Sequence, residues 1–285
     1  MPKPYLLGMY EKAVPKELDW LERLEVARES GFDYVEISVD ETDDKLARLD
    51  WSADERRELV QLQEKTGVPI RSMCLSGHRK YPFGATDPEV RAKSMDIMKK
   101  AIDLACDLGV RTIQLAGYDV YYEPGTDETR KWFAENLARA TEMAAREGVL
   151  LGFETMETPF MDTVGKSMAY VSQIDSPYLG VYPDLGNLTN ASFLYGESVT
   201  DDLAHGRGHI LAAHCKETVA GAYREIPFGT GTTDWAALDE CVRQGVRCFV
   251  AEFWYVGSED WRAETAFASK YVREKIEAAF ERCGK

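Results

Sequence analysis

Residues 150–184, LLGFETMETPFMDTVGKSMAYVSQIDSPYLGVYPD, contain two apolar runs of strand length, LLGFET at the start and LGVYPD at the end. Similar runs occur along the whole chain: YLLGMY from Tyr5, YVEISV from Tyr34, IRSMCLS from Ile70, TIQLAG from Thr112, ILAAHCK from Ile210 and CFVAEFW from Cys248. Successive runs begin 29 to 42 residues apart. That spacing is typical of one β-strand followed by one helix.

The segments between several of these runs have the pattern of amphipathic helices. The clearest are residues 19–31, 52–67, 87–109 and 127–148. Ser52, Asp87 and Asp127 stand where a helix N-cap belongs, and each of the four segments ends on a glycine, as helices often do. The C-terminal residues 261–284 are also amphipathic and are expected to form the last covering helix.

Eight strand–helix repeats predict the fold class. The strand runs are nearly continuous in apolar residues, as expected for parallel strands covered by helices. Eight such repeats in one chain predict an α/β protein, a closed (β/α)8 TIM barrel. No Pro/Gly/Ser-rich linker interrupts the sequence, so we expect a single domain over residues 1–285. An open, doubly wound sheet is the structural alternative.

The composition excludes several classes of protein. The chain has 285 residues, of which 45% are hydrophobic, so it can bury a large core. Its net charge of −15 opposes non-specific binding to nucleic acid or to anionic lipid. No apolar run approaches the ~18 residues of a membrane span, and the N-terminus lacks the pattern of a secretory signal. The six cysteines are scattered without a C-x-x-C pair, which favours reduced thiols. We therefore expect a cytoplasmic protein that binds neither nucleic acid nor membranes.

Four strand runs carry a residue that can bind a metal near their C-terminal ends. These residues, here named the strand-end cluster, are Glu154, Asp184, His214 and Glu252. In a closed barrel they would converge at the face where barrel enzymes place their chemistry. Taken singly, a strand-end Asp often caps the next loop and a lone His satisfies a hydrogen bond in the core. Three carboxylates and one imidazole together favour one divalent ion such as Zn²⁺, Mn²⁺, Mg²⁺ or Co²⁺.

Several longer stretches carry a resemblance to a known family. They are GMYEKAVP from Gly8, FDYVEISVDETDDKLARLDW from Phe32, SMCLSGHRKYPFG from Ser72, IQLAGYDVYY from Ile113, YPDLGNL from Tyr182, GHILAAHCKET from Gly208 and IPFGTGTTDW from Ile226. Over nearly its whole length the chain resembles the sugar-phosphate epimerases of the xylose-isomerase-like barrel superfamily. Within that superfamily it is most similar to the L-ribulose-5-phosphate (L-xylulose-5-phosphate) 3-epimerase family.

The resemblance implies an activity and a role for each cluster residue. The family's metal is held by two Glu, one Asp and one His, which match the strand-end cluster. The implied reaction is inversion of C3 of a phosphorylated 2-ketopentose through a cis-enediolate stabilised by the metal ion. Glu154 and Glu252 would be the two acid/base groups, one on each face of the intermediate. Asp184 and His214 would be ligands only.

The phosphate of such a substrate needs cations or backbone donors. Candidates are His78, Arg79 and Lys80 in SGHRKYPFG, Lys216 after the metal His, and Arg224 in GAYREIPFG. The Gly229-Thr230-Gly231 turn is a further candidate, because such a turn can present N–H groups to an anion. The resemblance favours Arg224 and adds Asn187 as a substrate contact. The alternatives are solvated loop charges and an ordinary turn.

Three other residues have expected positions near this site. Glu36 lies inside the run YVEISV. One alternative is that it reaches the floor of the site, but we expect it to be hydrogen-bonded within the barrel in a structural role. Tyr10 and Trp254 lie at strand ends, where they either line the sugar pocket or simply pack.

Three other functions are alternatives to this one. An aldose–ketose isomerase, or an epimerase of a related, unphosphorylated ketose, would use the same four ligands. A DNA-repair nuclease shares the barrel type but uses several metals and more His ligands, whereas this chain has four His and a charge of −15. A non-catalytic sugar-binding barrel is the third alternative. The sequence is compatible with a homodimer.

Overall fold

The computed structural model describes residues 3–285. Its strands are β1 (Leu6–Tyr10), β2 (Tyr34–Ser38), β3 (Ile70–Leu75), β4 (Thr112–Ala116), β5 (Leu150–Glu154), β6 (Leu179–Tyr182), β7 (Ala213–Cys215) and β8 (Cys248–Ala251). Its α-helices are α1 (Trp20–Glu29), α2 (Asp43–Leu46), α3 (Ala53–Thr66), α4 (Pro88–Leu108), α5 (Asp127–Glu147), α6 (Val164–Ile174), α7 (Leu185–Tyr195), α8 (Val199–His205), α9 (Leu238–Arg243) and α10 (Trp261–Arg282).

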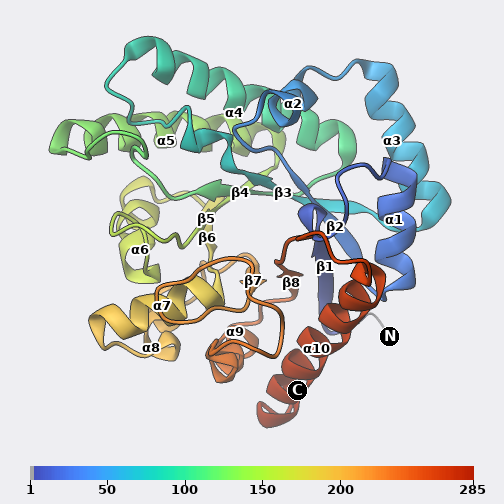
Figure 1. The fold of residues 1–285 in the computed structure, drawn as a ribbon. Coiled ribbons are helices and arrows are strands. Elements are labelled where there is room, and N and C mark those ends of the chain that lie inside the picture. The colour runs from blue at the N-terminus through green and yellow to red at the C-terminus, as the bar shows by residue number, and fades with distance from the viewer. Residues whose placement is uncertain (1–2) are drawn as a thin grey trace.

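The strands form one parallel sheet that curves into a nearly closed barrel. Their order is β6-β5-β4-β3-β2-β1-β8-β7, so β1 pairs with both β2 and β8. The remaining gap is bridged by two isolated parallel contacts, Val181 with Ile210 and Asp184 with His214. Helices surround the strands on the outside (Figure 1). The predicted TIM barrel is confirmed, and the open doubly wound sheet is excluded.

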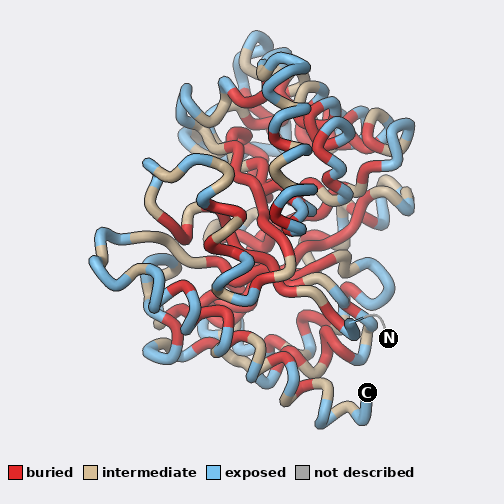
Figure 2. The backbone as a smooth tube through the Cα atoms, turned by 90° about the vertical axis from the view of Figure 1, so that its right-hand side faces the viewer, coloured by how far each residue is buried: buried red, intermediate tan, exposed pale blue. Residues whose placement is uncertain are grey.

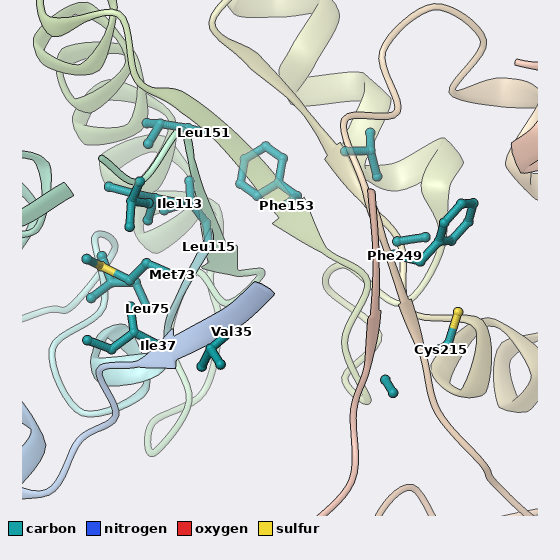
Figure 3. Packing of buried hydrophobic residues seen from close by; sticks show 14 of the residues in the cluster. Val35, Ile37, Met73, Leu75, Ile113, Leu115, Leu151, Phe153, Cys215 and Phe249 are labelled. Carbon is teal, nitrogen blue, oxygen red and sulfur yellow. The ribbon is translucent and has the colours of Figure 1, made fainter. Parts of the chain in front are cut away.

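The two faces of each strand contact different layers. Residues such as Val35, Met73 and Phe153 point outward from the strands (Figure 3). They belong to one buried cluster with helix residues such as Ile97 and Leu137. In Figure 2, buried residues follow the inner parts of the chain, and exposed residues lie mostly in the outer turns.

A second, smaller cluster fills the barrel interior. Its buried members are Tyr10, Tyr34, Cys74, Tyr182, Ala212 and Val250. Side chains alternate between the two layers because successive strand residues point to opposite faces. Polar residues that share the inward face therefore meet inside the barrel.

Most predicted helix ends agree with the structure. Ser52 and Asp87 are the N-caps of α3 and α4, and their side chains accept backbone N–H groups. The expected cap Asp127 is wrong by one position, because Thr126 caps α5 and Asp127 is its first helical residue. The expected last helix is α10.

The strand predicted from Ile210 is shorter than expected. Only residues 213–215 form β7, and Ile210 makes a single isolated bridge. All six cysteines are free thiols. In the described part of the chain, no helix combines the length and the apolar character that crossing a membrane requires.

Candidate metal centre and active site

The structure brings all four members of the strand-end cluster together. Glu154 is the last residue of β5, and Asp184 follows β6 by two residues. His214 is the central residue of β7, and Glu252 directly follows β8. One ligand atom of each residue lies within 4.8 Å of the others, and all four residues are buried. The predicted convergence at the C-terminal face is therefore present.

The facing atoms of this cluster lie close together around one point. His214 Nδ1 lies 3.5 Å from Glu154 Oε1, 3.4 Å from Glu252 Oε2 and 3.9 Å from Asp184 Oδ2. His214 Nδ1 is buried and has no hydrogen-bond partner, whereas the buried atoms Asp184 Oδ2 and Glu252 Oε2 face the Lys216 ammonium at 3.1 Å and 3.3 Å. A buried polar atom without a partner costs about 1–3 kcal/mol. Oxygen and imidazole donors converging in this way fit a divalent cation.

Asp184 has a structural role as well. Its Oδ1 accepts a 2.6 Å hydrogen bond from the backbone N–H of Asn187, so it is the N-cap of α7. Its own N–H donates to Thr155 Oγ1, and Asn187 Nδ2 donates to the Thr155 carbonyl. These bonds fix the turn after β6. One carboxylate oxygen thus caps the helix while the other faces the cluster.

Lys216 lies deeper than its expected place at the phosphate end. Its side chain is buried, with Nζ 3.1 Å from Asp184 Oδ2 and 3.3 Å from Glu252 Oε2. Nζ also donates to Asn187 Oδ1 at 2.9 Å. Lys216 therefore lies beside the strand-end cluster, where its ammonium compensates the charge of two buried carboxylates.

These neighbours shift the pKa values of the cluster. Burial raises the pKa of Asp184 to about 7, against the opposing effect of the Lys216 ammonium. Burial would also raise the pKa of Glu252, but Lys216 and His214 outweigh it and lower that pKa well below its usual value. For His214, burial is outweighed by Glu36 and Glu252, and the pKa is raised. The pKa values of Asp184 and Glu252, which are similar for the two side chains in water, are therefore far apart in this site.

A pocket opens above the cluster. It is lined by Tyr10, Lys12, Cys74, Ser76, Arg79, Glu154, Met156, Glu157, Asn187, Lys216, Tyr223, Arg224, Glu252 and Trp254. Tyr10 and Trp254 are among these lining residues, which agrees with the first of the two alternatives given for them. A larger hollow between α5 and α6 contains no cluster residue.

Two of the residues that line this pocket are arginines, Arg79 and Arg224. Arg224 Nη2 lies 3.3 Å from Glu157 Oε1, and Glu157 Oε2 accepts a 2.7 Å bond from Tyr118 Oη. Arg79 lies over the rings of Tyr118 and Tyr121, and its Nε is buried without a hydrogen-bond partner. Sequence reasoning missed Glu157 because nothing in its local pattern distinguishes it from a solvated acid.

Two predicted phosphate contacts lie elsewhere, which corrects the expectation. His78 is buried, its Nε2 is 3.1 Å from the Ser94 carbonyl oxygen, and its ring packs against Phe83. Lys80 is exposed, and its nearest acid is Asp43, 3.9 Å away. Neither residue lines the pocket. The side chains of His78, Arg79 and Lys80 diverge because the first two lie in a 3-10 helix, Ser76–Arg79, and Lys80 is its C-cap.

The Gly229-Thr230-Gly231 turn also needs correction. The Gly229 N–H donates to Glu217 Oε1 at 2.9 Å, and the Thr230 N–H bonds to the Pro227 carbonyl. A Cβ at Gly231 would come within 2.3 Å of Glu217 Oε2. The turn does receive an anion, but that anion is the protein's own buried carboxylate.

Comparisons with known proteins agree with this geometry. A family model described as xylose isomerase-like TIM barrel matches residues 24–275. The chain is 44% identical over 281 residues to the L-ribulose-5-phosphate 3-epimerase UlaE of Escherichia coli strain SMS-3-5, covering 98% of each protein.

Two solved structures share the fold. One is an L-ribulose 3-epimerase, with a TM-score of 0.77 and 19% identity over 98% of this chain and 97% of that one. The other is a xylose isomerase-like TIM barrel protein from Mycobacterium smegmatis in complex with magnesium, with a TM-score of 0.71 and 17% identity over 98% and 99% of the two chains. The chain therefore belongs to the xylose isomerase-like TIM barrel family, and within it to the sugar epimerases, which are isomerases.

Proposed function

We propose that this protein is a metal-dependent epimerase that inverts C3 of a phosphorylated 2-ketopentose, interconverting L-ribulose 5-phosphate and L-xylulose 5-phosphate. The observation that carries the proposal is the convergence of Glu154 and Glu252, from opposite parts of the strand order, in one buried cluster at the floor of the pocket. The choice of substrate is supported by the name of the relative that is 44% identical.

The strand-end cluster would hold one divalent ion, with Zn²⁺, Mn²⁺, Mg²⁺ and Co²⁺ as candidates. The ligand atoms would include His214 Nδ1, which has no hydrogen-bond partner, and Asp184 Oδ2, which lies 3.9 Å from it. Such an ion, when bound, supplies electrostatic stabilisation of the negative charge that develops on the substrate oxygens. Asp184 and His214 act as ligands only.

Glu154 and Glu252 perform the proton transfers. One carboxylate removes the proton from C3, and the electron pair of that C–H bond moves toward C2 to give a planar enediolate. The other, in its protonated form, returns a proton to C3 from the opposite face. The roles are exchanged in the reverse direction. Positioned acid/base groups of this kind contribute roughly 10²–10⁴-fold to the rate.

The remaining pocket residues bind and orient the ketose. Lys216 and Asn187, linked by a 2.9 Å hydrogen bond, contact the reacting end beside Glu252. Arg79 and Arg224 bind the phosphate, because guanidinium groups match phosphate oxygens in geometry and charge. Glu157, which pairs with Arg224, holds that side chain in place before substrate binds.

The reaction is tested by solvent isotope incorporation. Purified protein is incubated in D₂O with each ketose phosphate, with and without a chelator and added metal. We expect interconversion of the two ketoses with deuterium at C3, loss of activity with chelator, and recovery with metal. Deuterium at C1 instead would indicate an aldose–ketose isomerase. Absence of turnover with any added divalent metal would overturn the proposal.

The phosphate site is tested with Arg79→Gln and Arg224→Gln. Charge-assisted hydrogen bonds are worth about 1.5–3 kcal/mol, so KM for the ketose phosphate should rise roughly 10- to 100-fold. KM for unphosphorylated L-ribulose should change little. Lys80→Gln is the matched control, because Lys80 is a nearby cation outside the pocket. Equal changes for both substrates would contradict the assignment.

We further infer that residues 1–285 act as one catalytic domain on a small-molecule substrate in the cytoplasm. A homodimer stays a prediction, and light scattering of the purified protein would test it.

A further inference from the structure

Glu36 occupies a distinctive place in the barrel wall. It is the central residue of β2, fully buried, and pairs with Tyr10 on β1 and Ser72 on β3. The pairing of β2 with β3 shifts register between Val35 and Glu36. Irregularities of this kind change the direction of a side chain and are common beside active sites.

Both carboxylate oxygens of Glu36 are engaged. Oε2 accepts hydrogen bonds from Ser72 Oγ at 2.7 Å and from Tyr182 Oη at 2.9 Å. Oε1 lies 2.6 Å from His214 Nε2. The Tyr182 ring also packs edge-on against the His214 ring, with centroids 5.0 Å apart and planes at 72°. Tyr182 therefore restrains the carboxylate and the imidazole together.

The contact with Glu36 determines which imidazole nitrogen faces the strand-end cluster. A neutral imidazole has one N–H donor and one lone pair. Because a carboxylate only accepts, His214 donates its Nε2–H to Glu36. In the neutral, metal-binding form of His214 the lone pair is then on Nδ1, the atom that lies beside Glu154 and Glu252 without a hydrogen-bond partner.

We propose that Glu36 is a positioning residue of the metal centre. By accepting the Nε2–H of His214, it fixes the Nδ1 lone pair toward the other three ligands and strengthens metal binding. The carboxylate partner of a metal-binding His typically changes metal affinity 10- to 100-fold. The inference rests on the proposed function only in requiring that the cluster bind a divalent ion.

The test is titration of metal-free protein with Mn²⁺ by calorimetry. Glu36→Gln keeps the shape of the side chain but removes its charge, and we expect a dissociation constant roughly 10- to 100-fold higher than that of the unaltered protein. Tyr182→Phe removes one hydrogen bond to Glu36 and leaves His214 untouched. We expect it to weaken Mn²⁺ binding in the same direction by a smaller factor.

Glu11→Gln is the matched control. Glu11 is also a fully buried glutamate, but its carboxylate bonds to Arg48 and lies outside the cluster. We expect this variant to be less stable but to bind Mn²⁺ as the unaltered protein does. Unchanged Mn²⁺ affinity in Glu36→Gln, or equal weakening in Glu11→Gln, would overturn the inference. If circular dichroism shows Glu36→Gln unfolded, Tyr182→Phe decides: weakened Mn²⁺ binding supports the inference and unchanged binding overturns it.

This titration contains no sugar, so its result is separate from the proposed activity. Mn²⁺ affinity that depends on Glu36, in a protein that epimerises no ketose, would refute the proposed function and support the role of Glu36. If the protein epimerises the ketose phosphates but its Mn²⁺ affinity does not depend on Glu36, the proposed function is supported and the role of Glu36 is refuted.

Discussion

His78 provides a quantitative test of acid stability. Its side chain is 3% exposed, its Nε2 bonds to the Ser94 carbonyl, and its ring lies 4.5 Å from the Phe83 ring. Burial lowers the pKa of His78 from 6.5 to about 4, because a charged ring at this position would lose its hydration. The folded protein therefore keeps His78 neutral at pH values where the unfolded chain protonates it.

The sign and size of the effect follow from this difference. Between pH 6.5 and about 4 the unfolded state binds one more proton at this site than the folded state. The free energy of unfolding therefore falls as pH falls through that window. A shift of about 2.5 pH units corresponds to ~3 kcal/mol in total, at about 1.4 kcal/mol per unit. Roughly 2 kcal/mol of this is lost between pH 7 and pH 4.5.

The assay is urea unfolding at pH 7 and pH 4.5 for the unaltered protein and for His78→Gln. The Gln amide can donate to the Ser94 carbonyl but does not titrate. We expect acidification to cost the unaltered protein about 2 kcal/mol more than the variant. His209→Gln is the control, because His209 is exposed. If the difference in free energy of unfolding between the unaltered protein and His78→Gln is the same at pH 7 and pH 4.5, the reasoning is refuted. A rise in KM for the ketose phosphate in a stable His78→Gln protein would restore His78 as a substrate contact.

Three further outcomes are expected. Either Glu154→Gln or Glu252→Gln should lower epimerisation by roughly 10²–10⁴-fold and remove deuterium incorporation at C3, measured by NMR; near-normal turnover in both would reject the two-base mechanism. Glu11→Gln should lower the free energy of unfolding by about 3–5 kcal/mol, because it breaks a buried ion-pair network, and urea unfolding would detect the loss. Gly180→Ala should destabilise by about 1–3 kcal/mol, since its Cβ would come within 2.4 Å of the His209 carbonyl oxygen; Gly165→Ala, with no atom nearer than 3.6 Å, should be nearly neutral.

Local sequence patterns predicted most of the fold. Apolar runs and helix caps such as Ser52 are patterns of residues that are close in sequence, so the positions of strands and helices could be predicted from the sequence. The errors were at boundaries, where Thr126 rather than Asp127 caps α5, because both residues are adequate caps and packing decides between them. The length of β7 was overestimated because its pairing depends on strands far away in sequence.

The strand-end cluster was predictable for a related reason. Parallel strands of a barrel place their C-terminal ends at one face, so Glu154, Asp184, His214 and Glu252 had to approach one another once the barrel was assumed. The depth of Lys216 was not predictable from its position two residues after His214. It follows from the hydrogen bond to Asn187 and the two carboxylates, which come from other strands.

The sequence by itself therefore determined the alternation of strands and helices and the identity of the four candidate ligands, because periodicity and strand-end position are properties of short segments. Only the tertiary structure decided that Glu36 bonds to His214, 178 residues away, and that His78 packs in the core while Arg79 reaches the pocket. Such contacts depend on the directions of side chains across the closed barrel, and those directions are set by register and packing between distant strands.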